Sequence, residues 1–540
     1  METLRGADIV ARTLEALGVT RIFTLSGNHI MPVFDALLET GIAVVHVRHE
    51  AACVHMADAW GRLTGEVGVA LVTGGQGHTN GAAALFTALA AESPVLLLSG
   101  HAGVAECGRG AFQELAQAEI ARPTTKAAWT ASSVAGLAPD LARAFRIARE
   151  GRPGPVHVSL PVDLLERAVP AATVRIPDPE AAAPRVSEPA PDLVGDLLGA
   201  IASAERPLLV CGPALCDAAG REAMADLEER LGLPVVGMES PRGVNDPALG
   251  AFAEILVRAD LLVLLAKPLD FTLRFGDAPA VAPACRFALV DPDPALLARA
   301  PAERLAVSGL ADPRPLLAAL GARGGALPRH AAWHREARAA IAYRPPAWAD
   351  LCGSARLHPV ELCGAVDAFL AGHPDATLIC DGGEIGQWPQ ALVRSGRRLI
   401  NGVSGTIGAA IPFAIAAALQ RPGAPVVALM GDGTFGFHMA EFDTAVRYGV
   451  PFVAVVGNDA RWNAEHQIQL RSYGPERTRH CDLLPTRYDA VVQALGGFGA
   501  CVTDVADLPA ALEAAHASSL PACLNVMIES VPAPVIRRPG

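Results

Sequence analysis

The stretch that decides the fold is Val427–Trp462, VALMGDGTFGFHMAEFDTAVRYGVPFVAVVGNDARW. It contains two short apolar runs rich in valine, separated by a glycine-rich turn and a helical pattern. Continuous apolar runs of this length predict parallel strands that are buried on both faces of a sheet. An acidic residue follows each run, Asp432 after the first and Asp459 after the second. Since ligands collect at the carboxyl ends of parallel strands, we expect both carboxylates to face one site.

The residues around Asp432 indicate what this site binds. Gly431 and Gly433 let the backbone approach a ligand closely, and the helix that follows directs its N-terminal amides toward it. Those amides favour phosphate, whereas two carboxylates repel it. Mg²⁺ resolves the conflict because it binds carboxylates, phosphate oxygens and water together. A G-D-G turn is also ordinary turn chemistry, so it is the second acid, Asp459, that favours a metal–phosphate site.

The composition argues against several classes of protein. The chain has 540 residues and a net charge of −12, and nucleic-acid binding depends on clustered Lys and Arg. Its start, METLRGADIV, is too charged for a signal peptide, and its apolar stretches are far shorter than the roughly 18 residues that a membrane helix needs. The 11 cysteines are scattered without paired spacing, which indicates reduced thiols. We therefore expect a cytoplasmic protein without nucleic-acid or membrane partners.

Two segments rich in Pro, Ala and Gly predict linkers, at residues 168–192 and 321–333. They divide the chain into three domains, which we place at residues 1–168, 190–322 and 350–540. Within each domain, short runs rich in Val and Leu alternate with helical patterns, as in RPLLVCG and ADLLVLLA of the middle block. We therefore expect three doubly wound α/β domains, each built on a parallel sheet.

The first and last domains contain a similar stretch. Residues 68–100 and 425–459 both have the order strand, glycine-rich turn, helix, proline, strand, at nearly the same spacing. This similarity indicates an ancient duplication, although only the second copy has an acid in its turn. In that copy we expect GDGTFG to form a turn, and Phe437, Glu441 and Ala445 to share one face of the following helix.

The G-D-G turn is followed by 24 residues and then by N-D, and this arrangement resembles the diphosphate-binding motif of thiamine-diphosphate-dependent enzymes. The resemblance implies that Mg²⁺ is bound by Asp432, Asp459 and the backbone carbonyl oxygen of Arg461. The family commonly has asparagine where this chain has Asp459. A carboxylate is at least as good a ligand for Mg²⁺, but it adds negative charge beside the diphosphate.

The N-terminal domain resembles the pyrimidine-binding domain of the same superfamily over VVHVRHEAACVHMADAWGRLTGEVGVALVTGGQGHTN. The resemblance implies that Glu50 hydrogen-bonds N1′ of the cofactor's aminopyrimidine, which favours the imino tautomer that takes the proton from C2. A partly desolvated carboxylate suits this role because it can share a proton with its partner. A surface acid after a strand is the alternative, but the residues around Glu50 are too apolar to favour it.

Other stretches are similar to particular members of the superfamily. GRGAFQELAQAEIARPTTKAAW and GRPGPVHVSLPVDL resemble acetolactate synthases, whereas SGNHIMPVFDALLE and SGTIGAAI look like benzaldehyde lyase and its carboligase relatives. The match implies that His29 and Gln113 act with Glu50 as catalytic residues, and that Ile407 supports the cofactor in its bent shape. A capping histidine, a surface glutamine and an ordinary core isoleucine are the alternatives.

The resemblance also implies a set of cofactor-binding residues in both outer domains. They are Glu50, Thr73, Asn80, Gly382, Gly383, Glu384, Gly405, Ile407, Gly431, Asp432, Gly433, Thr434, Asp459 and Trp462. For Glu384 the alternative is a plain turn residue, and for Trp462 it is a half-buried amphipathic helix.

These similarities imply an enzyme that uses thiamine diphosphate and Mg²⁺ to make or break the carbon–carbon bond next to a carbonyl. The implied substrates are small carbonyl compounds, namely 2-oxo acids, aldehydes or 2-hydroxy ketones, as for an acetolactate-synthase-like or benzaldehyde-lyase-like carboligase. A 2-oxo acid decarboxylase and a 2-hydroxyacyl-CoA lyase are alternatives, and a non-catalytic cofactor-binding regulator is one of another class.

The sequence of the central domain predicts a Rossmann-like fold. It has no G-x-G-x-x-G motif, so we do not expect it to bind FAD. The same region holds a nucleotide portion in acyl-CoA lyases of the superfamily, so an adenine-containing ligand of the central domain is the alternative. The architecture of the family implies a homodimer or homotetramer with active sites at the subunit interface.

Overall fold

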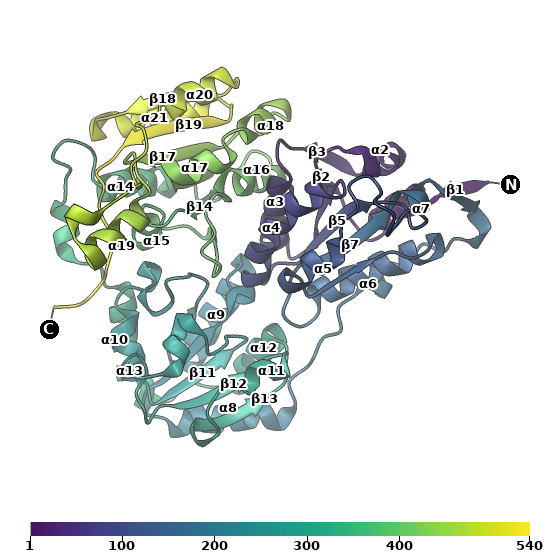
Figure 1. Cartoon of the computed structure of the whole chain (residues 1–540). Helices are drawn as coiled ribbons and strands as arrows, with labels where there is room; N and C mark the ends of the chain where they lie inside the picture. The colour runs from purple at the N-terminus through teal and green to yellow at the C-terminus, as the bar shows by residue number, and fades with distance from the viewer. Residues whose placement is uncertain (1, 540) are drawn as a thin grey trace. The chain divides into compact units, whose positions relative to one another are not determined.

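The computed structural model describes residues 2–539 and contains three parallel β-sheets that follow one another along the chain (Figure 1). The N-terminal sheet has six strands in the order β3-β2-β4-β5-β7-β6. Its strands are β2 (Arg21–Thr24), β3 (Ala43–His46), β4 (Gly68–Val72), β5 (Val95–His101), β6 (Ala127–Thr130) and β7 (Val156–Pro161). Its helices are α1 (Gly6–Ala16), α2 (Met31–Leu37), α3 (Glu50–Thr64), α4 (Gln76–Ala90), α5 (Gln117–Ala121), α6 (Leu137–Arg149) and α7 (Val162–Glu166).

The C-terminal sheet also has six strands, in the order β15-β14-β16-β17-β19-β18. Its strands are β14 (Thr377–Asp381), β15 (Arg397–Ile400), β16 (Val426–Gly431), β17 (Val453–Asn458), β18 (Phe498–Val502) and β19 (Ala522–Met527). Its helices are α14 (Pro359–Ala371), α15 (Gln387–Leu392), α16 (Ala410–Gln420), α17 (Asp432–His438), α18 (Glu441–Arg447), α19 (Asn463–Tyr473), α20 (Tyr488–Ala494) and α21 (Leu508–Ala517). Counted along the chain, its strand order is the same as that of the N-terminal sheet, which is what a duplication requires.

The central sheet has five parallel strands in the order β10-β9-β11-β12-β13. Its strands are β9 (Pro207–Cys211), β10 (Val235–Gly237), β11 (Leu261–Leu265), β12 (Arg286–Val290) and β13 (Leu305–Gly309). Its helices are α8 (Pro191–Ser203), α9 (Ala218–Leu231), α10 (Phe252–Leu256), α11 (Pro294–Leu297), α12 (Pro313–Arg323) and α13 (Ala331–Ala342). A short antiparallel pair, β1 (Thr3–Arg5) and β8 (Ala168–Pro170), lies outside the three sheets.

The strands are buried on both faces, as their continuous apolar runs predict. In β4, Val69 and Leu71 pack into a core cluster with side chains of α1 and α6. Ala70 and Val72 point to the opposite face and are equally buried. The predicted fold class, three doubly wound parallel-sheet domains, is therefore confirmed.

By internal contacts the described chain forms two compact units. The first contains the N-terminal sheet together with residues 411–422 and 438–450, that is, most of α16 and α18. The second contains the central and C-terminal sheets.

Two local expectations were wrong. Residues 432–438 form the helix α17, not a turn, and the chain breaks at Met439–Ala440 before α18 begins. Because of this break, Phe437 does not share a helical face with Glu441: Phe437 is 55% exposed, whereas Glu441 is buried. The second predicted linker, residues 321–333, is partly helical, and its last residue, Trp333, packs into the central core.

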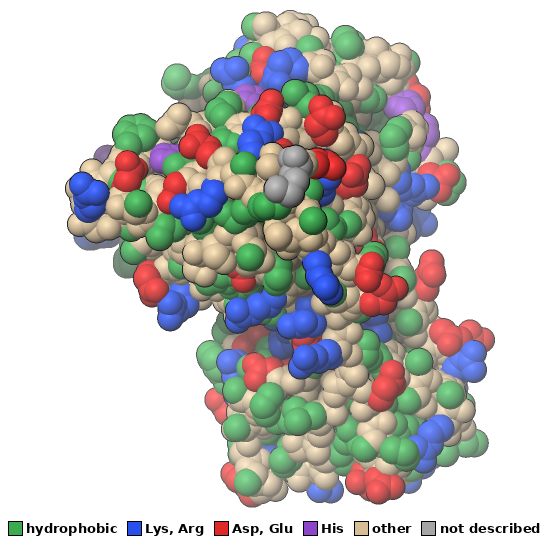
Figure 2. Space-filling view, turned by 90° about the vertical axis from the view of Figure 1, so that its right-hand side faces the viewer, with side chains coloured by type: hydrophobic (Ala, Val, Ile, Leu, Met, Phe, Trp, Pro, Cys, Tyr) green, Lys and Arg blue, Asp and Glu red, His purple; other side chains and the backbone are tan. Residues whose placement is uncertain are grey.

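The surface and the cysteines match the composition. Acidic and basic side chains are interspersed on the face shown in Figure 2. All eleven cysteines are free thiols. Within residues 2–539, no helix is both long and apolar enough to cross a bilayer.

Close packing between α3 and β4 generates a prediction about stability. A Cβ atom on Gly68 would lie 1.9 Å from the carbonyl oxygen of Ala57 in α3, so Gly68→Ala must displace the helix whose first residue is Glu50. We expect it to lower the free energy of unfolding by about 1–3 kcal/mol or more. Gly81→Ala, in α4, is the control: its nearest neighbours lie at 3.6 Å or beyond, and it should gain up to about 1 kcal/mol. Urea unfolding measures both; equal effects would contradict the account.

Candidate active site

The two predicted acids meet at the carboxyl edge of the C-terminal sheet. β16 and β17 are paired neighbours, with Gly431 opposite Gly457, so Asp432 and Asp459 follow adjacent strand ends. Their carboxyl groups are in hydrogen-bonding contact with each other. The backbone N–H of Arg461 also donates to Oδ2 of Asp432 at 3.2 Å.

Burial makes this pair difficult to ionise without a cation. Burial raises the pKa of Asp432 to about 6. Burial, together with repulsion from Asp432, raises the pKa of Asp459 to about 7. The pair is therefore incompletely ionised at neutral pH, and positive charge beside it would favour the doubly ionised form.

A cavity of about 330 Å³ opens beside the pair. All the residues predicted for the diphosphate side line it, namely Gly382, Gly383, Glu384, Gly405, Ile407, Gly431, Asp432, Gly433, Thr434, Asp459, Arg461 and Trp462. The absence of a side chain at Gly433 is required by Trp462, since a Cβ there would lie 2.6 Å from Cζ3 of the indole. Trp462 thus packs against the first turn of α17 and lines the cavity as well.

A buried amide network, which sequence reasoning missed, holds the loop after β17. Asn458 accepts a hydrogen bond from the backbone N–H of Ala460 at 3.1 Å and donates to Oδ1 of Asn525 on β19 at 3.0 Å. Asn525 in turn donates to the backbone carbonyl of Thr486 and to Asp489. The only sequence signal was a polar residue inside the apolar run ACLNVM. This network fixes the backbone on both sides of Asp459.

A second missed residue, Asp381, holds the loop that carries Ile407. Its Oδ2 accepts hydrogen bonds from the backbone N–H groups of Gly408 and Ala410, each at 3.0 Å. Burial raises the pKa of Asp381 to about 6. Ile407, next to this anchor, is half-buried and lines the cavity.

Glu384 has structural partners as well as a place in the cavity wall. Its carboxylate lies 3.4 Å from the guanidinium of Arg242 and accepts a hydrogen bond from the backbone N–H of Ala533. Arg242, from the loop after β10, also donates to the carbonyl oxygen of Gly383 at 2.5 Å. The turn after β14 is therefore clamped by the central domain and by the C-terminal segment.

The predicted pyrimidine side lies in the other unit. Glu50 is the first residue of α3 and is largely buried, and its Oε2 accepts a hydrogen bond from Nδ2 of Asn80 at 3.0 Å. Glu441 of α18 holds the turn before it, because its Oε1 accepts from the backbone N–H groups of Arg48 and His49 at 3.0 and 3.1 Å. Burial raises the pKa of Glu441, so ionising its carboxyl group costs free energy. The hydrogen-bond network around it is rigid once formed.

His29 and Gln113 lie near the glycine-rich turn after β4. Nδ1 of His29 is 3.3 Å from Oγ1 of Thr73, and its ring stacks on Phe112. Gln113 has a positive φ of 55°, and its Cβ lies 2.7 Å from where a Cβ on Gly75 would be. The structure thus brings these predicted residues around one turn.

Sequence reasoning passed over Gln117, which holds that turn in place. The side chain of Gln117 is buried; its Oε1 accepts from the backbone N–H of Gly75 at 2.8 Å, and its Nε2 donates to the carbonyl of Gly100 at 3.0 Å. It thereby ties the turn that Gln113 packs against to the end of β5. Its signal was faint, a second glutamine in the quoted stretch FQELAQ.

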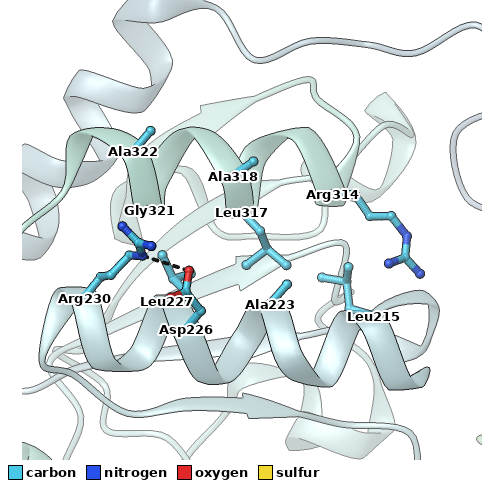
Figure 3. Close-up of a pocket in the computed structure, with 10 residues that line it drawn as sticks. All are labelled: Leu215, Ala223, Asp226, Leu227, Arg230, Arg314, Leu317, Ala318, Gly321 and Ala322. Carbon is cyan, nitrogen blue, oxygen red and sulfur yellow. Dashed lines mark hydrogen bonds and ion pairs between the residues drawn. The ribbon is translucent and has the colours of Figure 1, made fainter.

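The central domain has a cavity of a different character (Figure 3). It has a volume of about 370 Å³ and lies between α9 and α12, with Leu215, Leu227 and Leu317 on its wall. Its charged side chains are largely engaged, since Arg230 pairs with Asp226 and Arg314 with Asp217. It contains no pair of adjacent carboxylates, and it includes none of the residues predicted for the site.

Comparison with known protein families agrees with the division of the fold into three sheets. Models of the thiamine pyrophosphate enzyme family match the chain in three parts: the N-terminal TPP binding domain at residues 4–120, the central domain at 194–320 and the C-terminal TPP binding domain at 381–526.

The chain is also similar to curated proteins over almost its whole length. It is 33% identical to the acetolactate synthase large subunit IlvG of Mycobacterium tuberculosis, over 98% of this chain and 96% of that protein. It is 33% identical to human 2-hydroxyacyl-CoA lyase 2, over 92% of this chain and 84% of that protein. With three family domains in the order of its three sheets, the chain belongs to the thiamine pyrophosphate enzyme family and is a thiamine-diphosphate-dependent carbon–carbon lyase or transferase.

Proposed function

We propose that the enzyme binds the diphosphate of its cofactor through Mg²⁺ held by Asp432, Asp459 and the carbonyl oxygen of Arg461, and that it acts on a small carbonyl substrate. The observation that carries this proposal is the buried carboxylate pair at adjacent strand ends, beside a cavity with glycine at Gly431 and Gly433. Each carboxylate is hard to ionise there alone, and a divalent cation offsets both charges.

The residues present fit Mg²⁺ better than a metal bound by protein alone. Among residues 2–539, no group of three or more His, Cys, Asp and Glu side chains is arranged to hold a metal ion. Two carboxylates and one backbone carbonyl leave coordination positions for phosphate oxygens and water, which is the usual environment of Mg²⁺. The donor set therefore supports an ion that binds together with a diphosphate.

The protein's own groups supply proton handling and position. When bound, thiamine diphosphate supplies the electron sink for chemistry at the carbon next to a carbonyl. Glu50 uses Oε2 to bind Asn80, and its Oε1 lies beside Gly77, so Oε1 is the atom that would hold the pyrimidine proton. Burial lowers the pKa of His29, so its imidazole is neutral at neutral pH and can exchange a proton with a substrate oxygen. We assign Gln113 to the same pocket.

The class of substrate follows from the family and its relatives. The names acetolactate synthase and 2-hydroxyacyl-CoA lyase 2 support 2-oxo acids, aldehydes, 2-hydroxy ketones or 2-hydroxyacyl thioesters as substrates. Acetolactate-synthase-like or benzaldehyde-lyase-like carboligation is our first assignment, and 2-oxo acid decarboxylation and 2-hydroxyacyl-CoA cleavage are the second. Screening pyruvate, benzoin, benzoylformate and a 2-hydroxyacyl-CoA for turnover tests this assignment.

We further propose a cytoplasmic homodimer or homotetramer in which Glu50 of one subunit serves the diphosphate site of its partner. The domain boundaries that go with this assembly are residues 1–168, 190–322 and 350–540. Size-exclusion chromatography that finds only an active monomer would refute the assembly.

The role of Glu50 is tested by Glu50→Gln. We expect kcat to fall by about 10²–10⁴-fold, because general acid–base catalysis by a positioned group contributes that much. Exchange of the C2 proton of bound cofactor, followed by NMR in deuterated water, should slow in parallel. Glu39→Gln, at an exposed acid after α2, is the control and should match wild type. Equal exchange rates in Glu50→Gln and wild type would remove Glu50 from this role.

The two metal carboxylates should not be equivalent. Asp459→Asn keeps an oxygen ligand and removes the repulsion from Asp432, so Mg²⁺ affinity should stay within about threefold. Asp432→Asn removes the carboxylate at the start of α17, and Mg²⁺ affinity should fall at least about tenfold. Titration calorimetry with Mg²⁺, at saturating thiamine diphosphate, measures both. Unchanged affinity in Asp432→Asn would exclude the proposed ligand set.

Binding of Mg²⁺ should depend on pH in a defined direction. The pKa values of Asp432 and Asp459, about 6 and about 7, lie above the ordinary value of 3.8. In the metal-free protein, ionising the pair therefore costs stability as pH rises toward 7. Mg²⁺ binds the ionised form, so protons compete with it, and its dissociation constant should fall as pH rises from 5 to 8 and then level off. A dissociation constant independent of pH over this range would contradict the assignment.

A further inference from the structure

Two buried amide side chains line the cavity without any protein partner for their oxygens. Gln387 is the first residue of α15 and Asn401 directly follows β15; they are 2% and 3% exposed. Oε1 of Gln387 and Oδ1 of Asn401 are buried and accept no hydrogen bond within the part of the chain that the structure describes. Other buried side-chain atoms of the described residues also lack a partner, Oε1 of Gln390 among them, but Gln387 and Asn401 line the cavity, where a ligand can supply the missing hydrogen bonds.

Asn401 stands away from the metal end of the cavity. The strand order is β15-β14-β16-β17, and neighbouring strands lie about 4.8 Å apart. Asn401, at the end of β15, is therefore roughly 10 Å from the end of β16 and roughly 14 Å from that of β17. A cation between Asp432 and Asp459 holds phosphate at the β16–β17 end. Asn401 thus faces another part of the bound reactants, and Gln387 lies in the wall of the same cavity.

The charges in the cavity wall do not favour a free carboxylate at this end. The guanidinium of Arg242 is engaged by Gly383 and Glu384. The guanidinium of Arg461 is paired with Asp482 at 2.7 Å. Both arginines that line the cavity are thus already neutralised, and the groups left over at the β15 end are uncharged amides.

We propose that Gln387 and Asn401 form an amide subsite that hydrogen-bonds uncharged oxygens of the substrate, the hydroxyl and carbonyl of a 2-hydroxy carbonyl compound. This inference rests on the proposed function and narrows its substrate class. A primary amide both donates and accepts, so the pair can donate to a carbonyl oxygen and accept from the neighbouring hydroxyl. A 2-oxo acid has no hydroxyl to donate and brings a carboxylate that no free cation of the wall meets. The subsite therefore favours 2-hydroxy ketones or 2-hydroxyacyl thioesters over 2-oxo acids.

The experiment compares substrates that share an acyl group, acetyl or benzoyl. The holoenzyme is assayed with acetoin against pyruvate and with benzoin against benzoylformate, and 2-hydroxyacyl-CoA cleavage is measured beside them. We expect kcat/KM to favour the uncharged member in at least one pair, and Gln387→Met and Asn401→Leu each to reduce that preference at least tenfold. Preference for the 2-oxo acid in both pairs, or an equal loss on both members, overturns the subsite.

A cofactor titration separates this inference from the proposed function. The dissociation constants of thiamine diphosphate and Mg²⁺ should stay within twofold of wild type in Gln387→Met and Asn401→Leu. If they weaken tenfold while turnover persists, the amides serve the cofactor and the subsite is overturned, but the proposed function stands. If wild type binds no cofactor with Mg²⁺, or turns over no substrate of the set, the proposed function fails and the subsite fails with it.

Thermal unfolding of the ligand-free protein tests the amide subsite independently of enzyme activity. Because the oxygen of Gln387 has no partner, Gln387→Met should preserve or raise Tm. Gln390→Met is the control on the same helix: Nε2 of Gln390 donates to the carbonyl of Gly386 at 2.8 Å, its Oε1 is unpaired like that of Gln387, and Gln390 does not line the cavity. The control should lower Tm and leave the substrate preference unchanged. A fall in Tm with Gln387→Met as large as with Gln390→Met overturns the proposal.

Discussion

The contact between the carboxyl groups of Asp432 and Asp459 is the interaction on which the site depends. Two parallel strands that pair as neighbours place the residues after them about one strand spacing apart. The βαβ connection therefore forces the carboxylates together, and the buried position makes each harder to ionise. A cation between the two carboxylates favours their ionised form, so the fold and the proposed metal requirement have the same origin.

The loops around this pair are held by buried polar side chains from other elements. Asn458 and Asn525 hold the backbone after β17, Asp381 holds the loop of Ile407, and Glu441 holds the turn before Glu50. Loops at strand ends have backbone N–H groups that no ladder satisfies, and a buried carboxylate or amide is an efficient acceptor for them. Each device fixes the backbone and leaves the neighbouring side chain available for chemistry.

The sequence predicted the parts of the molecule that are set by local pattern. The apolar runs predicted the parallel strands, and Asp432 and Asp459 could be placed together because β16 and β17 are consecutive. Asn525 and Asp381 could not be assigned, because their partners lie on elements distant in the sequence. The break before Glu441 was also missed, because it falls at Met439–Ala440, where neither Gly nor Pro marks the end of a helix.

Two buried asparagines of the C-terminal sheet show how an amide that supports the site differs from one available to a ligand. The amide of Asn525 has its oxygen and its nitrogen hydrogen-bonded, and it lies away from the cavity. Asn401 is equally a buried asparagine at a strand of the same sheet, yet its oxygen has no partner and its side chain lines the cavity. Residue type, burial and sheet are shared, so the unmet hydrogen bond and the place in the cavity wall together separate the two roles. A ligand gains most affinity from polar groups that are already buried and unpaired in the free protein. It can hydrogen-bond to them without breaking other hydrogen bonds.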